Sequence, residues 1–320
     1  MMRFATGRLM GAFLVLLAKS FVVFALIGLM PGDPIDLLAT ANPESTAEDV
    51  AKLRAIYGVD QPLGARYVNW LEAMSQGDLG YSRITHRPVV ESMGPALVNT
   101  LVLTVPAFLI STVLAFVLGT LAALRKGTWL ERGINLFAFA GISVPGFWLG
   151  LLLIYIFAVR LGLLPAGGMP RPDGAYPAWA HLVLPMLTLV IVEIGGLTRY
   201  VRASMLDVMN QDYIRTAQAK GLATPRIIWT HALRNAMIPL ATIIALGFGH
   251  LASGATLIET MFGWRGMGRL IYEAIMGNDF NLALACLMLT TLLILVANLL
   301  ADISYSLLDP RIGLAGTKRE

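Results

Sequence analysis

Long apolar runs separated by short polar stretches occupy most of the chain. Each run is long enough, at about 20 residues, to cross the hydrocarbon core of a bilayer as a helix. The pattern predicts six spanning helices, which lie within residues 9–30, 91–125, 132–160, 181–198, 234–259 and 280–301. The first run lacks the small-residue cleavage pattern of a signal peptide, so we expect it to stay as a membrane helix. The chain is therefore predicted to be an all-α polytopic membrane protein.

The composition agrees with this pattern and excludes several other classes. The chain has 320 residues, of which 57% are hydrophobic and 14% are charged, whereas a soluble domain carries about 25% charged residues. Its one cysteine, Cys286, lies inside an apolar run, which excludes a disulfide framework and a paired-cysteine metal site. The four histidines show no metal-ligand spacing. We expect the chain to bind no cofactor and no metal.

The distribution of basic residues predicts the orientation in the membrane. Lys and Arg occur in short clusters between the apolar runs, which is not the basic patch with aromatic residues that nucleic-acid binding requires. A cytoplasmic N-terminus places more Lys and Arg on the cytoplasmic side than on the outer side, as the positive-inside rule requires. We expect a multi-pass protein of the bacterial cytoplasmic membrane, with both termini in the cytoplasm and no nucleic-acid partner.

Two connections are too long to be simple turns. The outer one, residues 31–94, is acidic and has Trp70 among helix-forming residues, so we expect a small helical cap outside the membrane. The other connection, residues 199–235, faces the cytoplasm and is named the coupling loop below. The predicted organisation is an N-terminal end with the first helix (1–30), the cap (31–94), a core of five membrane helices that includes the coupling loop (95–302), and a cytoplasmic tail (303–320).

The coupling loop has the local signals of two helices joined at a glycine. Residues 204–220 lack Pro and Gly and predict one helix, which ends at Gly221 because glycine accepts the left-handed conformation of a helix C-terminus. Thr224 followed by Pro225 predicts the start of a second helix, with Thr224 as the N-cap. The loop is therefore predicted to be helix, glycine, helix.

The residues of this loop resemble the cytoplasmic signature of ATP-binding cassette (ABC) importer permeases, most closely the dipeptide, oligopeptide and nickel branch. The matching positions are Asp212, Tyr213, Arg215, Thr216, Ala217, Lys220 and Gly221, followed by His231, Leu233, Arg234 and Asn235. The resemblance extends over nearly the whole chain through shorter motifs at residues 31–34, 77–80, 143–148, 259–268 and 308–311.

The resemblance implies a type I ABC importer permease core and a set of partners. These are a second homologous permease, two ABC ATPase subunits, an extracytoplasmic substrate-binding protein and the lipid bilayer. The chain has no G-x-x-x-x-G-K-[ST] phosphate loop, so ATP and Mg would be used by the partner ATPases and this chain would be a non-catalytic subunit. The resemblance implies that the coupling loop seats in a groove on the ATPase, where Arg215, Lys220 and Arg234 would pair with acidic residues.

Two charged residues fall inside predicted spans. Lys19 lies near the middle of the first span, where an unpaired charge is unfavourable, so we expect it to face protein and to pair with Glu193 or Asp302. Glu193 precedes Gly195 and Gly196 in the fourth span. It is a candidate for lining the transport pathway, and a role in helix packing is the alternative.

The transported solute is left open by the sequence. The resemblance favours short peptides, and the alternatives are nickel, glutathione, opines or another small peptide-like solute. Two alternatives from other functional classes are an intramembrane enzyme and a self-contained channel. An enzyme is disfavoured because only Glu193 is a clear intramembrane polar candidate and no G-x-S-x-G elbow is present.

Overall fold

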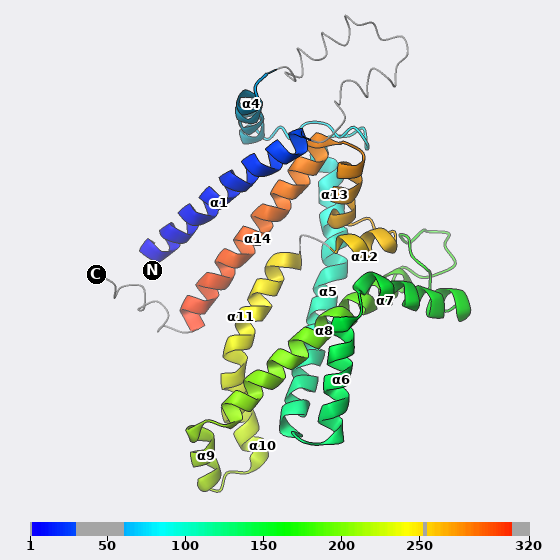
Figure 1. The fold of residues 1–320 in the computed structure, drawn as a ribbon. Coiled ribbons are helices and arrows are strands. Elements are labelled where there is room, and N and C mark those ends of the chain that lie inside the picture. Colours follow the sequence, from blue (N-terminus) through cyan, green and yellow to red (C-terminus); the bar gives the residue numbers. More distant parts are fainter. Residues whose placement is uncertain (1, 30–60, 252–254, 309–320) are drawn as a thin grey trace, which may run out of the picture.

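The computed structural model describes residues 2–29, 61–251 and 255–308, and its elements are helices (Figure 1). Apart from one isolated bridge between Tyr81 and Pro88, these ranges contain no β pairing. The α-helices are α1 (Met2–Gly28), α4 (Leu63–Ser75), α5 (Val89–Leu124), α6 (Trp129–Ser143), α7 (Gly146–Leu153), α8 (Ala180–Met209), α9 (Asp212–Ala219), α10 (Thr224–Arg226), α11 (Leu233–Leu251), α12 (Thr256–Met261), α13 (Met267–Met276) and α14 (Phe280–Leu308); the π-helices are η1 (Ile154–Arg160) and η2 (Ile227–Ala232). The all-α class is confirmed.

The predicted count of six spanning helices is not confirmed. Within the described ranges, four helices are long and apolar enough to cross a bilayer, namely α1, α5, α8 and α14. A fifth span would have to combine α6 with α7 and η1, and these two parts meet at an angle of 102°. The run at 234–259 forms α11 and the start of α12, with residues 252–254 outside the described ranges.

The 102° bend divides the spanning helix predicted within residues 132–160 into two parts, and Pro145 explains it. A proline disfavours the helical conformation of the preceding residue and cannot donate a backbone hydrogen bond within a helix. Val144 accordingly has extended backbone angles and ends α6, while Pro145 is the N-cap of α7.

The centre of the molecule is a close pairing of α5, α6 and α8 through small residues. A Cβ atom added to Gly119 of α5 would lie 2.6 Å from the Cβ of Val201, and one added to Gly195 of α8 would lie 2.3 Å from the carbonyl oxygen of Ala138. Glycine therefore permits both helix contacts, as small residues commonly do between membrane helices. These contacts fix α8, from which the coupling loop continues.

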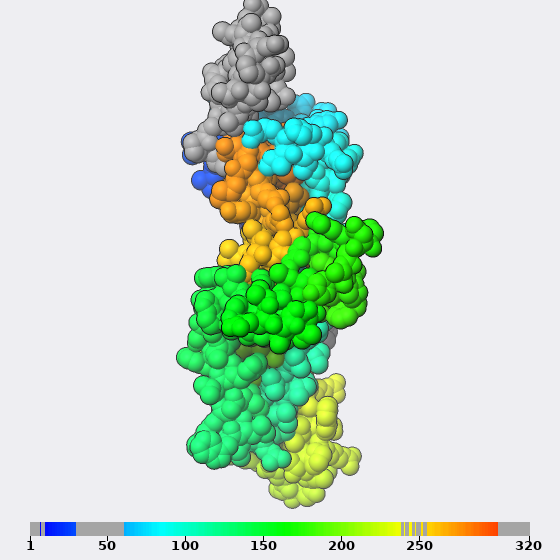
Figure 2. Space-filling view, turned by 90° about the vertical axis from the view of Figure 1, so that its right-hand side faces the viewer, coloured from blue at the N-terminus to red at the C-terminus, as the bar shows by residue number. Residues whose placement is uncertain are grey.

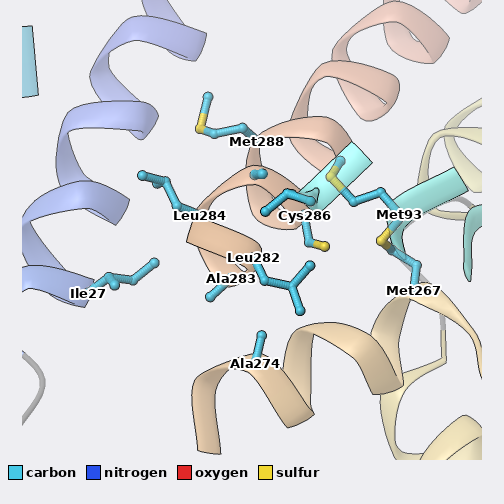
Figure 3. Close-up of a cluster of buried hydrophobic side chains, with 11 residues drawn as sticks. Ile27, Met93, Met267, Ala274, Leu282, Ala283, Leu284, Cys286 and Met288 are labelled. Atoms are coloured by element: carbon cyan, nitrogen blue, oxygen red, sulfur yellow. The ribbon is translucent and has the colours of Figure 1, made fainter. Parts of the chain in front are cut away.

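A second contact region is an apolar cluster that packs α1, α5, α13 and α14 together (Figure 3). In addition, α4 packs against α1, where the Tyr67 hydroxyl lies 2.6 Å from the Ser20 hydroxyl and Trp70 lies beside Phe24. The helix predicted around Trp70 is therefore present as α4. Residues 30–60 of the predicted cap lie outside the described ranges.

Two buried carboxylates hold the segments that connect these helices. Glu259 of α12 accepts hydrogen bonds from the Thr100 hydroxyl (2.7 Å) and from the backbone N–H of Arg269 (3.0 Å). Asp279 accepts from the Ser82 hydroxyl (2.6 Å) and also from the backbone N–H of Leu282 in the first turn of α14 (3.2 Å). Both carboxylates join residues that are more than 150 positions apart.

Candidate functional site at the coupling loop

The coupling loop contains a break between α8 and α9, so the prediction of one continuous helix over residues 204–220 is wrong at 210–211. The backbone N–H of Asn210 donates to the Asp207 carbonyl oxygen (3.3 Å), and Gln211 then takes an extended conformation. Because of the break, α9 turns and buries Ile214 and Ala217 in an apolar cluster. A straight continuation of α8 would carry these two residues away from that cluster. Burial of apolar surface therefore overrides local helix propensity here.

Gly221 ends α9 as the sequence predicts. Its φ is +75°, a left-handed conformation that glycine adopts without a Cβ clash. The Gly221 N–H donates to the Gln218 carbonyl oxygen (2.9 Å), and the Leu222 N–H donates to the Ala217 carbonyl oxygen (3.3 Å). This pair of bonds is the Schellman motif, and it returns Leu222 to the apolar cluster under α9.

The second helix of the loop starts where the sequence predicts, but with a different cap. Ala223 is the N-cap of α10 and makes no side-chain cap bond, so the assignment of that role to Thr224 is wrong. Pro225 lies in the first turn, where its missing N–H has no cost. The helix then continues through the π-helix η2 into α11 without a break, whereas α9 is separated from α8 by the break at 210–211.

An apolar cluster anchors the loop to the ends of the long helices. It contains Met205 of α8, Ile214 of α9, Ile227 of η2 and Leu233 of α11, all of them buried. The loop lies at one end of the molecule, beside the turn between α5 and α6 (Figure 1) and below the α7 surface in Figure 2. A displacement of the loop would therefore act directly on α8 and α11.

The structure divides the predicted loop residues between two faces. The exposed ones are Asp212, Tyr213, Arg215, Thr216, Lys220, Gly221, Arg234 and Asn235; His231 is half-buried, and Ala217 and Leu233 are buried in the cluster. Arg215 and Asp212 form an exposed ion pair of 3.5 Å, which in water contributes little to stability. Ala217 and Leu233 thus support the loop from inside, and the polar residues are available to a partner.

Two features of this end of the molecule were missed by the sequence reasoning. Trp229 of η2 is 72% exposed, although an indole normally buries a large apolar surface. Glu131 of α6 forms an ion pair with Arg202 of α8. A signal for Glu131 was present, because Thr128 and Glu131 have the spacing of a capping box, and the Thr128 hydroxyl accepts from the Glu131 N–H.

The structure does not bring the two predicted intramembrane charges together. Glu193 of α8 accepts a hydrogen bond from the Ser111 hydroxyl of α5 (2.8 Å) and is half-buried. Lys19 lies on the exposed face of α1, a helix that packs against α14 and α4. The side chain of Asp302, the other proposed partner of Lys19, is outside the described part of the structure. Among the described residues, no three His, Cys, Asp or Glu side chains are placed to hold a metal ion.

The sequence matches two families that together extend over almost the whole chain. Residues 115–314 match the family described as the inner membrane component of binding-protein-dependent transport systems. Residues 1–104 match the family described as the N-terminal part of a membrane component of such systems.

Two relatives are similar over nearly their full length. The oligopeptide transport system permease protein AppB of Bacillus subtilis is 35% identical over 302 residues, which is 93% of this chain and 95% of AppB. The glutathione transport system permease protein GsiC of Escherichia coli strain CFT073 is 36% identical over 312 residues, which is 98% of this chain and 99% of GsiC.

Solved structures show the same fold at lower identity. A chain of the MetNI methionine ABC transporter in an inward-facing conformation superimposes with a TM-score of 0.57 and 17% identity. The match extends over 69% of this chain and 98% of the MetNI chain. At this level of identity the match supports the fold, which is that of a type I ABC importer permease.

Proposed function

Because this chain belongs to the inner membrane components of binding-protein-dependent transport systems, we propose that it forms, with a second homologous permease, the pathway by which short peptides enter the bacterial cytoplasm. Its family makes it a non-catalytic permease subunit of an ABC transporter. The proposal of a peptide substrate is supported by the oligopeptide and glutathione permeases that are about 35% identical to it.

The observation that carries the proposal is the exposed polar face of the coupling loop. Its buried residues fix α9 and η2 rigidly to α8 and α11, while Tyr213, Arg215 and Trp229 are exposed. A rigid loop with an exposed aromatic and basic surface is suited to a groove on another protein, because aromatic and Arg side chains contribute most to protein interfaces. We assign this groove to the ATPase subunits, which would use ATP and Mg.

Coupling requires that the ATPases hold the loop differently in the outward and inward states. A partner with equal affinity for both states would shift nothing, however tightly it bound. Since the apolar cluster ties the loop to α8 and the loop runs directly into α11, closure of the ATPases around nucleotide would move these two helices as levers. The proposed movement is a rigid-body change of the kind that other transporters and allosteric proteins use.

The proposed orientation places the coupling loop and both termini in the cytoplasm. Arg125 and Lys126 lie in the turn between α5 and α6, at the same end of the molecule as the coupling loop (Figure 1). A concentration of basic residues at one end agrees with the positive-inside rule. The extracytoplasmic binding protein would then deliver substrate at the opposite end, where α4 and α13 lie.

The test is purification of the affinity-tagged chain in mild detergent from cells that express its neighbouring transport components, followed by reconstitution. We expect recovery of a second permease and two ATPase subunits, and ATP-dependent uptake of a short peptide supplied through the binding protein. Uptake is also measured for nickel, glutathione and an opine. A chain that purifies alone and conducts solute without ATP would be a channel and would contradict the proposal.

A further inference from the structure

A groove of about 570 Å³ lies between α6 and α8. It is lined by Asn135 and Phe139 of α6 and by Gly196, Arg199, Tyr200, Arg202 and Ala203 of α8. The volume lies in the range of small-molecule sites, about 300–1,000 Å³. The coupling-loop mechanism described above makes no use of it.

The two arginines of the groove differ in their partners. Arg202 donates to the Glu131 carboxylate, so its charge is already neutralised. Arg199 is exposed, and no carboxylate of the described residues lies within ion-pair distance of it. The groove therefore holds one unbalanced guanidinium, next to the Tyr200 side chain and across from the Asn135 amide. Guanidinium, phenol and amide groups all donate hydrogen bonds to a carboxylate.

The groove has free space beside Gly196 of α8. A Cβ atom added to Gly196 would meet nothing within 4 Å, in contrast to the tightly packed Gly195 beside it. Glu193, three residues before Gly196, continues the row of side chains toward the middle of the membrane and is half-buried. Along this side, α8 thus carries a carboxylate, which accepts from Ser111 of α5, and, closer to α9, a guanidinium with no ion-pair partner among the described residues.

We propose that this side of α8 lines the transport pathway and binds the two ends of a zwitterionic short peptide, with Arg199, Tyr200 and Asn135 holding its C-terminal carboxylate and Glu193 holding its N-terminal ammonium group. The inference rests on the proposed function, since it names the substrate class of the same pathway. Charges inside a membrane protein usually face a water-filled cavity or a partner, and this row of polar residues on one spanning helix follows that rule.

The spacing of the charges suits a short peptide. Six or seven residues separate Glu193 from Arg199 and Tyr200, which is about 10 Å along a helix at 1.5 Å per residue. An extended tripeptide spans at most about 10 Å. The order of the charges also gives the peptide a direction, because its carboxylate would lie nearer the cytoplasm than its ammonium group.

The test measures ATP-dependent uptake of a tripeptide by the reconstituted complex, supplied through its own binding protein. We expect Arg199→Gln to lower uptake at least tenfold and Arg199→Lys, which keeps the charge, to stay within threefold of the wild type. Each variant is compared with the wild type on the same peptide, so selection by the binding protein cancels. Equal uptake by the Gln and Lys variants would overturn the inference.

A second readout separates a binding role from a structural one. Ala203→Cys, which lines the groove and keeps Arg199 in place, is labelled with a negatively charged methanethiosulfonate reagent, and Lys126→Cys, which is exposed in the turn between α5 and α6, serves as the control. We expect excess tripeptide during turnover to slow labelling at position 203 at least fivefold and to leave position 126 unchanged. A labelling rate at position 203 that does not respond to peptide would contradict the inference, even if Arg199→Gln lost uptake, because lipid or a structural role would then account for the groove.

The two proposals fail in distinguishable ways. If the wild-type complex takes up no peptide with ATP, the proposed function is wrong. If the wild type takes up peptide but neutralising Arg199 has no effect, the permease function stands and only the assignment of the groove is wrong.

Discussion

Arg202 of α8 donates from its Nε atom to the Oε1 atom of Glu131, at the first turn of α6, across 3.0 Å. The other oxygen of Glu131 accepts from the backbone N–H of Gly127, which closes the turn between α5 and α6. One carboxylate therefore ties this turn to α8, about two turns before α8 ends at Met209. Movement of α8 at this end would carry α6 with it.

The first prediction concerns this pair. Glu131→Gln should leave the Arg202 guanidinium without its countercharge and weaken the contact between α6 and α8, since removing one partner of a partly buried ion pair is unfavourable. We expect the thermal unfolding midpoint in detergent to fall by a few degrees. Arg125→Gln, an exposed residue in the same turn, is the control and should leave the midpoint unchanged. An equal midpoint for both variants would show that the pair adds nothing to stability.

The second prediction concerns the Thr100 hydroxyl, which donates to Glu259 (2.7 Å) and accepts from the Met267 N–H (2.7 Å). Thr100→Val keeps the shape but leaves the Met267 N–H and the Oε1 atom of Glu259 without these hydrogen bonds, and a buried polar group left unpaired costs about 1–3 kcal/mol. We expect a clear loss of stability in denaturant unfolding.

A matched control for Thr100 exists on the same helix. The Thr112 hydroxyl is buried and has no hydrogen-bond partner in the described part of the structure. Thr112→Val should therefore be neutral or stabilising. If both variants lost stability equally, the loss would come from the change of side chain and not from the hydrogen bonds of Thr100.

The third prediction concerns Trp229, which is exposed on η2 beside α9. Trp229→Ala should leave the folding of the isolated chain unchanged and weaken its association with the ATPase subunits about tenfold or more, as expected for a central aromatic residue of an interface. The measurement is the amount of ATPase that co-purifies with each variant as the detergent concentration of the wash is raised. Trp129→Ala removes an indole that is 83% exposed at the start of α6 and should have no such effect. The same ATPase retention by both variants would remove Trp229 from the interface.

Much of this fold follows from local signals in the sequence. Gly221 ends α9 because only glycine takes that φ easily, and the apolar runs predict α1, α5, α8 and α14. Pro145 is likewise a local signal for the bend after α6. In contrast, the break at Asn210 depends on where the next apolar side chains, Ile214 and Ala217, find a buried site. Such tertiary preferences are invisible to a reading of one segment at a time.

The same limit applies to the site. The coupling-loop residues form a contiguous motif, so a resemblance to a family identifies them together. The Glu131–Arg202 pair and the groove around Arg199 arise between α6 and α8, which are separated in the sequence by α7, η1 and a loop. Only the three-dimensional packing of the two helices brings these residues together.

The central claim is that the bent loop between α8 and α11 transmits ATPase motion to the membrane helices. ATP-dependent peptide uptake by complexes with a changed Gly221 tests it most directly. Gly221→Pro fixes φ near −65° and removes the N–H that bonds to Gln218, whereas Gly221→Asn keeps the donor and tolerates a positive φ.

We predict that the Pro variant inserts into the membrane at a normal level but loses uptake, while the Asn variant keeps most of it. Normal uptake by an inserted Gly221→Pro variant would contradict the account.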